Sequence, residues 1–373
     1  MREDSVLGII FSNMHDETIA ELTRNRTMGS VPFGGRYRLI DFALSNMVNS
    51  GITKVGVITK SNYQSLMDHI GSGKSWDLSR KRDGLFILPP FGAGQGVYTS
   101  RIEALNGISS FIKRSREEYV FMTDCGAVCN IDINKIVENH KENEADITII
   151  YKNGVLPEKT KDTAVIKLDK NNRVYDIDID PVYENDEECS YSINMFLMKK
   201  TYLERLIADA FSKSSLSFER DILQSNVEKA KIIGYHSEGY VGVINSLNSF
   251  FEANMQLLNK DVREKLFPVS RPVYTKIRDD MPAKYGLSSS VKNSFVADGC
   301  IIEGEVENSI LFKGVHIGKG TKVKNSVIIQ QSYIGDDCNL SYIITDKNVI
   351  IKDGRTLMGY KTYPVFIEKS RVI

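Results

Sequence analysis

The chain contains 373 residues, more than one small domain needs, so two or three domains are expected. Hydrophobic residues make up 42% of the chain and charged residues 26%, as in globular proteins with a large core. The 48 Lys and Arg residues balance the 48 Asp and Glu residues, which argues against a general nucleic-acid-binding protein. No apolar run approaches the ~18 residues of a membrane span, and Val6–Phe11 is too short for a signal-peptide core.

The cysteines are scattered along the chain and number five, which is odd. This pattern favours free thiols and a reducing, cytoplasmic compartment. Cys125 and Cys129 lack the second ligand pair of a zinc site, so we expect two small buried thiols there.

The first part of the chain alternates short apolar runs with amphipathic segments. The apolar runs predict strands at Val6–Phe11, Lys54–Thr59, Tyr119–Thr123 and Asp146–Tyr151, and the stretch 163–198 is mostly strand-like. The amphipathic segments predict helices at Arg36–Asn49, Tyr63–Ile70, Arg101–Ser115, Ile133–Asn143, Tyr202–Ala210, Phe218–Lys229 and Ser246–Asn259. This alternation predicts a doubly wound, mostly parallel α/β sheet, which binds ligands at the carboxyl ends of its strands.

The composition changes after about Val262. Segment 263–290 contains Pro268, Pro272 and Pro282 and shows little periodicity, so we expect it to link a domain of residues 1–262 to a second one of residues 291–373.

The second domain repeats a short phrase without any helical period. The phrase begins at Ile302, Ile317, Ile334 and Ile351, in steps of 15, 17 and 17 residues. Within it, Ile317 and Val323 are six residues apart, as are Ile334 and Leu340. An apolar residue at every sixth position predicts a parallel β-helix, in which three hexads close one triangular coil and about four coils stack.

One segment carries a specific signature: residues 32–46 have the sequence PFGGRYRLIDFALSN. Together with residues 49–52, 69–73, 76–78, 88–90, 118–120, 252–255 and 271–276, it resembles bacterial glucose-1-phosphate adenylyltransferases, which make ADP-glucose for glycogen. The resemblance covers essentially the whole chain. It implies a Rossmann-like nucleotidyltransferase domain with a mixed, mostly parallel sheet, followed by a left-handed β-helix.

The chemistry of that family sets definite requirements. Glucose 1-phosphate attacks the α-phosphorus of ATP, so the site must bind and neutralise the triphosphate. A glycine-rich turn, cationic side chains and carboxylate-bound Mg²⁺ supply this stabilisation.

This sequence departs from the family at those positions. Where the family has the glycines and the arginine of its phosphate turn, the chain has Asn13, Met14, Asp16 and Thr18. Met28 and Asp180 replace two phosphate-facing lysines, Val243 replaces the second metal-binding aspartate, and the segment 100–104 is also altered. Only the first metal-type carboxylate remains, as Asp124, and a structural role for it is the alternative.

Losing one charge-stabilising contact typically slows an enzyme ~10²–10³-fold, and several are missing here. The resemblance therefore points to the GlgD type of subunit, which is non-catalytic and modulates a catalytic partner. We expect this chain to need no cofactor, its partner to use Mg²⁺, and the two to form a heterotetramer, with self-association as a further option. The alternatives are a weakly active or altered nucleotidyltransferase and, third, a hexapeptide acyltransferase with His316 as its base.

Arg26 and Arg38 match family positions beside the site for phosphorylated effectors. The guanidinium fork suits phosphate geometry, so both are candidate effector-binding residues. The alternative is that such arginines pair with nearby acidic residues.

Overall fold

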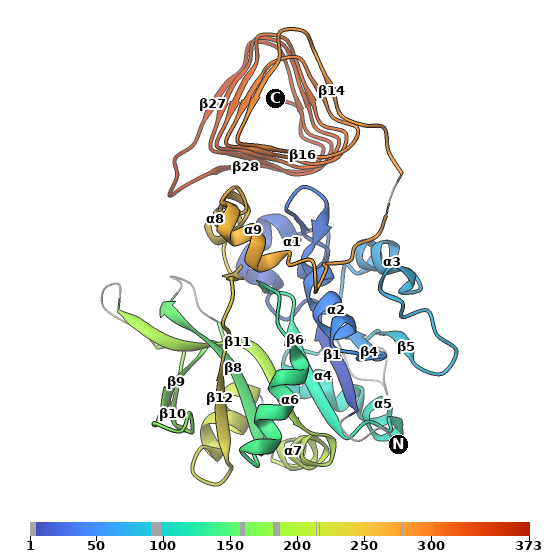
Figure 1. Ribbon diagram of the computed structural model, residues 1–373, viewed down its shortest axis with the longest axis vertical. Coiled ribbons are helices and arrows are strands. Elements are labelled where there is room, and N and C mark those ends of the chain that lie inside the picture. The colour runs from blue at the N-terminus through green and yellow to red at the C-terminus, as the bar shows by residue number, and fades with distance from the viewer. Residues whose placement is uncertain are drawn as a thin grey trace.

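The computed structural model describes residues 5–90, 98–156, 161–181, 187–213, 215, 217–277 and 279–373. It consists of an α/β domain and a triangular β-helix beside it, joined by an extended segment (Figure 1).

A mixed nine-stranded sheet forms the centre of the first domain. Its strands are β1 (Val6–Phe11), β4 (Lys54–Ile58), β5 (Gly84–Leu88), β6 (Tyr119–Asp124), β8 (Ile147–Val155), β9 (Ala164–Leu168), β10 (Val174–Ile179), β11 (Glu188–Lys199) and β12 (Ile232–His236). Strand β1 lies between β4 and β6 and is parallel to both, whereas β11 runs antiparallel to β6 and β8. The central strands are continuous apolar runs because helices and turns bury both faces of the sheet.

The helices of the first domain mostly agree with the predicted ones. They are α1 (Ala20–Thr23), α2 (Leu39–Asn49), α3 (Gln64–Ile70), α4 (Arg101–Gly107), α5 (Ser109–Arg114), α6 (Ile133–Glu142), α7 (Lys200–Ser212), α8 (Leu247–Gln256) and α9 (Lys260–Leu266). No helix in these described ranges is both long enough and apolar enough to cross a bilayer.

Three helix predictions needed correction. Helix α2 begins at Leu39 because Tyr37–Arg38 form β3, which pairs with β2 (Pro32–Phe33). The helix predicted over Arg101–Ser115 is divided at Gly107, a poor helix former. The helix predicted over Phe218–Lys229 is instead a π-turn followed by a short 3₁₀ turn.

The β-helix has three parallel sheets, each with five strands in the described chain, so the predicted four coils were too few. The first sheet contains β14 (Lys284–Tyr285), β17 (Ile301–Ile302), β20 (His316–Ile317), β23 (Tyr333–Ile334) and β26 (Ile350–Ile351). The second contains β15 (Ser290–Lys292), β18 (Glu305–Glu307), β21 (Lys322–Lys324), β24 (Asn339–Ser341) and β27 (Thr356–Met358). The third contains β16 (Phe295–Val296), β19 (Ile310–Leu311), β22 (Val327–Ile328), β25 (Ile343–Thr345) and β28 (Val365–Ile367).

The hexapeptide interpretation is confirmed by burial. The predicted corner residues have side chains with no exposure: Ile302, Ile317, Val323, Ile334 and Leu340. Parallel pairing already begins at β14, before residue 291, and α9 runs across the predicted boundary between 262 and 263.

The two parts share one apolar core. Ile310, Phe312 and Val327 of the third β-helix sheet pack in the same cluster as Phe33 and Phe251 of the first domain. The junction therefore holds the β-helix in a fixed place against the segment that follows β1.

Replacing Ile317 with Asp would bury an unpaired charge among apolar corner residues. We expect a loss of several kcal/mol in the free energy of unfolding, about enough to unfold the domain. Thermal unfolding monitored by circular dichroism measures it, with Thr356→Asp, on the exposed side of β27, as the matched control. Equal melting of the two variants would contradict the coil assignment.

Candidate functional site

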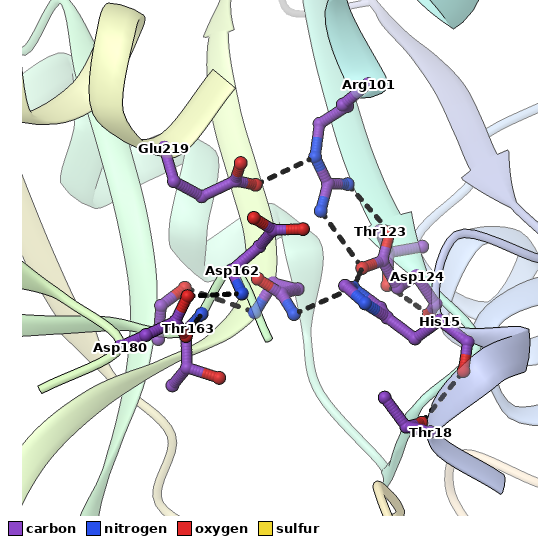
Figure 2. A network of polar contacts seen from close by, with 11 residues as sticks. His15, Thr18, Arg101, Thr123, Asp124, Asp162, Thr163, Asp180 and Glu219 are labelled. Atoms are coloured by element: carbon purple, nitrogen blue, oxygen red, sulfur yellow. Dashed lines mark hydrogen bonds and ion pairs between the residues drawn. The ribbon is translucent and has the colours of Figure 1, made fainter. Parts of the chain in front are cut away.

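The carboxyl ends of β1 and β6 lie side by side, where a doubly wound sheet binds its ligands. The turn after β1 carries His15, and Asp124 is the last residue of β6. Nε2 of His15 lies 2.8 Å from Oδ2 of Asp124, and both side chains are buried (Figure 2).

Arg101, the first residue of α4, binds both oxygens of Asp124. Its Nη1 donates to Oδ1 at 2.7 Å and its Nη2 to Oδ2 at 3.0 Å (Figure 2). The guanidinium is 2% exposed and lies over the rings of Phe11, Phe196 and Phe218. A bidentate pair in such an apolar surrounding is held in one geometry.

Glu219 completes the network from the opposite side. Nε of Arg101 donates to Oε1 of Glu219 at 3.2 Å, and Glu219 is also buried. With His15 protonated, two cations face two carboxylates, and the buried group is electrically balanced. The network of His15, Arg101, Asp124 and Glu219 is called the central ion network below.

The pKa shifts follow from these contacts. Burial raises the pKa of a carboxyl, but Arg101 and the hydrogen bond from His15 outweigh it at Asp124 and hold its pKa at about 2. Burial lowers the pKa of His15, yet the hydrogen bond and charge of Asp124 raise it overall. Burial raises the pKa of Glu219, and the charge of Arg101 lowers it. The net shift is upward because Glu219 makes one contact with Arg101, whereas Asp124 makes two.

Little space remains beside the network. The cavity lined by His15, Asp124, Asn194 and Val243 has a volume of about 40 Å³. This suffices for water, whereas small-molecule sites measure about 300–1,000 Å³. Larger hollows adjoin it, of about 350 Å³ beside Val243 and about 760 Å³ along Asn13 and Asp16, so the restriction applies to the space next to Asp124.

The donor set does not fit Mg²⁺. A catalytic Mg²⁺ needs one or two carboxylates with open oxygens, and both oxygens of Asp124 are taken by Arg101. Val243 offers no ligand atom, and the described ranges contain no cluster of three or more His, Cys, Asp or Glu that could hold a metal. Both oxygens of Asp124 thus make the buried contacts that a structural role, the alternative in the sequence, would require.

Hydrogen bonds within the chain occupy the polar groups of the altered phosphate turn. Asp16 accepts a hydrogen bond from the backbone N–H of Met28 at 2.7 Å, Asn13 accepts one from the hydroxyl of Tyr98, and the hydroxyl of Thr18 donates to the carbonyl of His15. Met14 packs against the apolar core on that side of the sheet. At the position where the family's turn binds phosphate, the side chain of Asp16 thus accepts a backbone N–H.

The remaining altered positions are also occupied by internal contacts. Met28 is 2% exposed and packs in the core. Asp180 accepts the backbone N–H groups of Asp162 and Thr163 at 3.0 and 2.8 Å (Figure 2). A carboxylate with two backbone donors stands where the family's lysine would meet a sugar phosphate.

Comparisons with known proteins agree with this architecture. A family model described as nucleotidyl transferase matches residues 17–260, and one described as GlmU-like, C-terminal hexapeptide matches residues 281–362. The glycogen biosynthesis protein GlgD of Bacillus subtilis is 34% identical over 373 residues, 100% of this chain and 98% of the relative. The chain belongs to the glucose-1-phosphate adenylyltransferase family.

Two further relatives support this assignment. The glycogen biosynthesis protein GlgD of Geobacillus stearothermophilus is 38% identical over 323 residues, 86% of this chain and 83% of the relative. The glucose-1-phosphate adenylyltransferase of Clostridium perfringens (strain SM101) is 34% identical over 340 residues, 90% of this chain and 87% of the relative. The hexapeptide match agrees with the left-handed form of the β-helix.

The candidate effector residues Arg26 and Arg38 lie at the junction between the domain and the β-helix. Arg26 binds both oxygens of Asp346 from the β-helix, at 2.8 and 2.7 Å, and is 3% exposed. Nη1 of Arg38 donates to the carbonyl of Ser65 at 2.6 Å, and its side chain is also buried. Pairing with an acidic residue, the alternative for these arginines, is thus realised at Arg26.

Lys347 joins these two arginines. Burial, with the charges of Arg38 and Arg26, lowers its pKa to about 7. Nη1 of Arg26 is buried and has no hydrogen-bond partner in the described chain. Arg26, Arg38, Lys347 and Asp346 are called the junction cluster below; it holds three basic groups against one carboxylate.

Sequence reasoning missed three members of the central ion network. The altered segment 100–104 contained the signal for Arg101, since a new arginine beside a retained carboxylate suggests a pair. Glu219 is 118 residues from Arg101 in the chain, and nothing local marks it. Cys125 and Cys129 are buried free thiols, as expected.

Arg101→Leu would leave two carboxylates buried without their counterion. We expect a loss of about 3–5 kcal/mol in the free energy of unfolding, measured by chemical denaturation. The matched control is Arg80→Leu, which breaks an exposed pair with Asp77 and should cost about 1 kcal/mol or less. Adding Asp124→Asn and Glu219→Gln to Arg101→Leu should recover stability. Equal losses of stability in Arg101→Leu and Arg80→Leu would refute the network's role.

Asp16 makes stability fall as the pH rises. Burial raises its pKa from 3.8 to about 7, so the folded state holds a proton that the unfolded state has lost between these values. The stabilisation is present below pH ~4 and lost by pH ~7, for a total of up to ~4 kcal/mol. Asp16→Asn should therefore raise the melting temperature most at pH 8, less at pH 5 and hardly at all below pH ~4. The exposed Glu17→Gln serves as control, and a pH-independent effect of Asp16→Asn would contradict the assignment.

Proposed function

We propose that this chain is a regulatory, non-catalytic subunit that associates with a catalytic glucose-1-phosphate adenylyltransferase in glycogen biosynthesis in the cytoplasm. The central ion network carries this proposal. Arg101 occupies both oxygens of the one carboxylate that remains of the family's metal site. A substrate complex would have to break a buried, balanced ionic network before Mg²⁺ could bind, which costs several kcal/mol.

The outer surface of the β-helix supports association with a partner. The first sheet presents Ile301, Tyr333, Ile350 and Val372 to solvent, with exposures of 38–52%. The neighbouring second sheet instead exposes ion pairs such as Glu307 with Lys324. A row of apolar side chains on one flat face is typical of protein–protein contacts.

The junction cluster supports an effector role. Its basic groups exceed its acidic ones, and a guanidinium nitrogen of Arg26 is unpaired and buried there. A phosphorylated metabolite would supply the missing negative charge and keep Lys347 protonated. Because the cluster joins the two parts of the chain, such binding would bias their arrangement and, through it, the partner.

The isolated chain should form ADP-glucose from ATP, glucose 1-phosphate and Mg²⁺ at no measurable rate, whereas the catalytic subunit alone should be active. Mixing the two should change the partner's apparent substrate affinity or effector response about 5–150-fold, the usual range of allosteric coupling. Lys347→Gln should reduce any effector dependence that this chain contributes, and Lys322→Gln, exposed on the second sheet of the β-helix, is the control. Turnover of ~1 s⁻¹ or more by this chain alone would favour a weakly active nucleotidyltransferase.

Association is tested separately by sedimentation. Ile350→Lys on the apolar face should weaken the mixed complex at micromolar concentration, and Thr356→Lys on the neighbouring face should not. Separate migration of the two wild-type chains, with unchanged partner kinetics, would refute the regulatory role.

A further inference from the structure

A second cavity lies at the opposite edge of the sheet from the central ion network. It is lined by Tyr119, the first residue of β6, whereas Asp124 is the last residue of that strand. At ~3.3 Å per residue, the two ends are ~17 Å apart. The cavity has a volume of about 640 Å³, within the range of small-molecule sites. Its walls come from α6 and α7, at the end of the domain farthest from the β-helix (Figure 1).

His140 lines this cavity and carries one polar atom that no described residue binds. Its side chain is 1% exposed, and its Nδ1 lies 2.8 Å from the hydroxyl of Thr148. Nε2 is buried and has no hydrogen-bond partner among the described residues. Burial, followed by the charge of Lys199, lowers the pKa of His140 to about 4, so the ring is neutral. A buried ring nitrogen without a partner is costly unless a ligand or water binds it.

The N-terminus of α7 lies in the same cavity wall. This helix has 13 residues and begins without a side-chain cap. Its first-turn residues Thr201 and Tyr202 line the cavity, and so does Arg205 one turn later. The N–H of Lys200 already donates to the carbonyl of Glu118 at 2.8 Å. The later N–H groups of the first turn and the helix dipole are what would attract an anion.

The charges around the cavity favour an anion over a cation. Lys199 and Arg205 lie at its wall with exposed side chains, and Lys141 adds a third basic group. Two carboxylates oppose them, but Asp146 already accepts the backbone N–H of Lys231 at 2.9 Å. Glu144 is the remaining acidic group at the wall.

We propose that this cavity binds the phosphate group of a small phosphorylated metabolite, with Lys199, Arg205 and the N-terminus of α7 around the phosphate and His140 Nε2 donating to it. The rings of Tyr119 and Tyr202 line the rest of the space, which exceeds what a phosphate group fills. In this proposal, the organic part of the metabolite fills the space beside the two tyrosine rings. This site is independent of the junction cluster and does not depend on the proposed regulatory function.

Histidine NMR tests the proposal directly. The chain has five histidines, so ring-labelled protein gives few signals, and His140→Gln identifies that of His140. Inorganic phosphate, titrated at constant ionic strength, should shift the His140 signal with a Kd of ~1 mM or tighter. Phenyl phosphate should bind more tightly than inorganic phosphate, because its ring fills the space beside the tyrosines.

The double variant Lys199→Gln/Arg205→Gln should weaken phosphate binding at least ~10-fold, because both charged donors are lost. Both side chains are exposed, so the variant should fold normally, and Lys213→Gln at the other end of α7 is the matched control. Three outcomes would overturn the proposal: no shift of His140 at ~20 mM phosphate, the same affinity in the double variant, or a shift confined to His69 near Arg38.

Discussion

The buried pair of Arg101 and Asp124 is the contact on which the first domain's site depends. A carboxylate at the end of β6 cannot remain charged among apolar side chains without a partner. In a catalytic nucleotidyltransferase a metal and phosphates meet this requirement, whereas here a guanidinium from α4 does so. His15 and Glu219 follow from the same constraint, since each balances a charge that the pair alone would leave.

The other altered positions obey the same rule. Asp16 accepts a backbone N–H from Met28, and Asp180 accepts two, from Asp162 and Thr163. Both carboxylates stand at positions where the family resemblance implies contacts with phosphate groups. In the structure each of these carboxyl groups accepts hydrogen bonds from the backbone of the chain itself, so neither needs a ligand as its partner. The altered residues form a consistent set in which the protein supplies both the cation and the anions.

The sequence predicted the architecture well because periodicity and burial are local properties. The strands β1, β4 and β6 and the coil residues Ile317 and Ile334 follow from apolar spacing alone. The motif resemblance also located the altered positions. What the sequence could not supply was pairing between distant segments. Glu219 meets Arg101, and Asp346 meets Arg26, across 118 and 320 residues, and each pair depends on how separate elements are placed in three dimensions.

The internal counterions also change how the fold relates to its surroundings. A protein that binds nucleotide and metal is stabilised by mass action, so its resistance to unfolding rises and falls with the concentrations of those ligands. Here the groups that balance the charge of Asp124 are side chains of the protein itself, so their supply does not vary with conditions in the cell. In the proposed non-catalytic subunit, the core around β1 and β6 would keep the same stability whether the cell is rich or poor in ATP, and its lifetime would not follow the nucleotide supply.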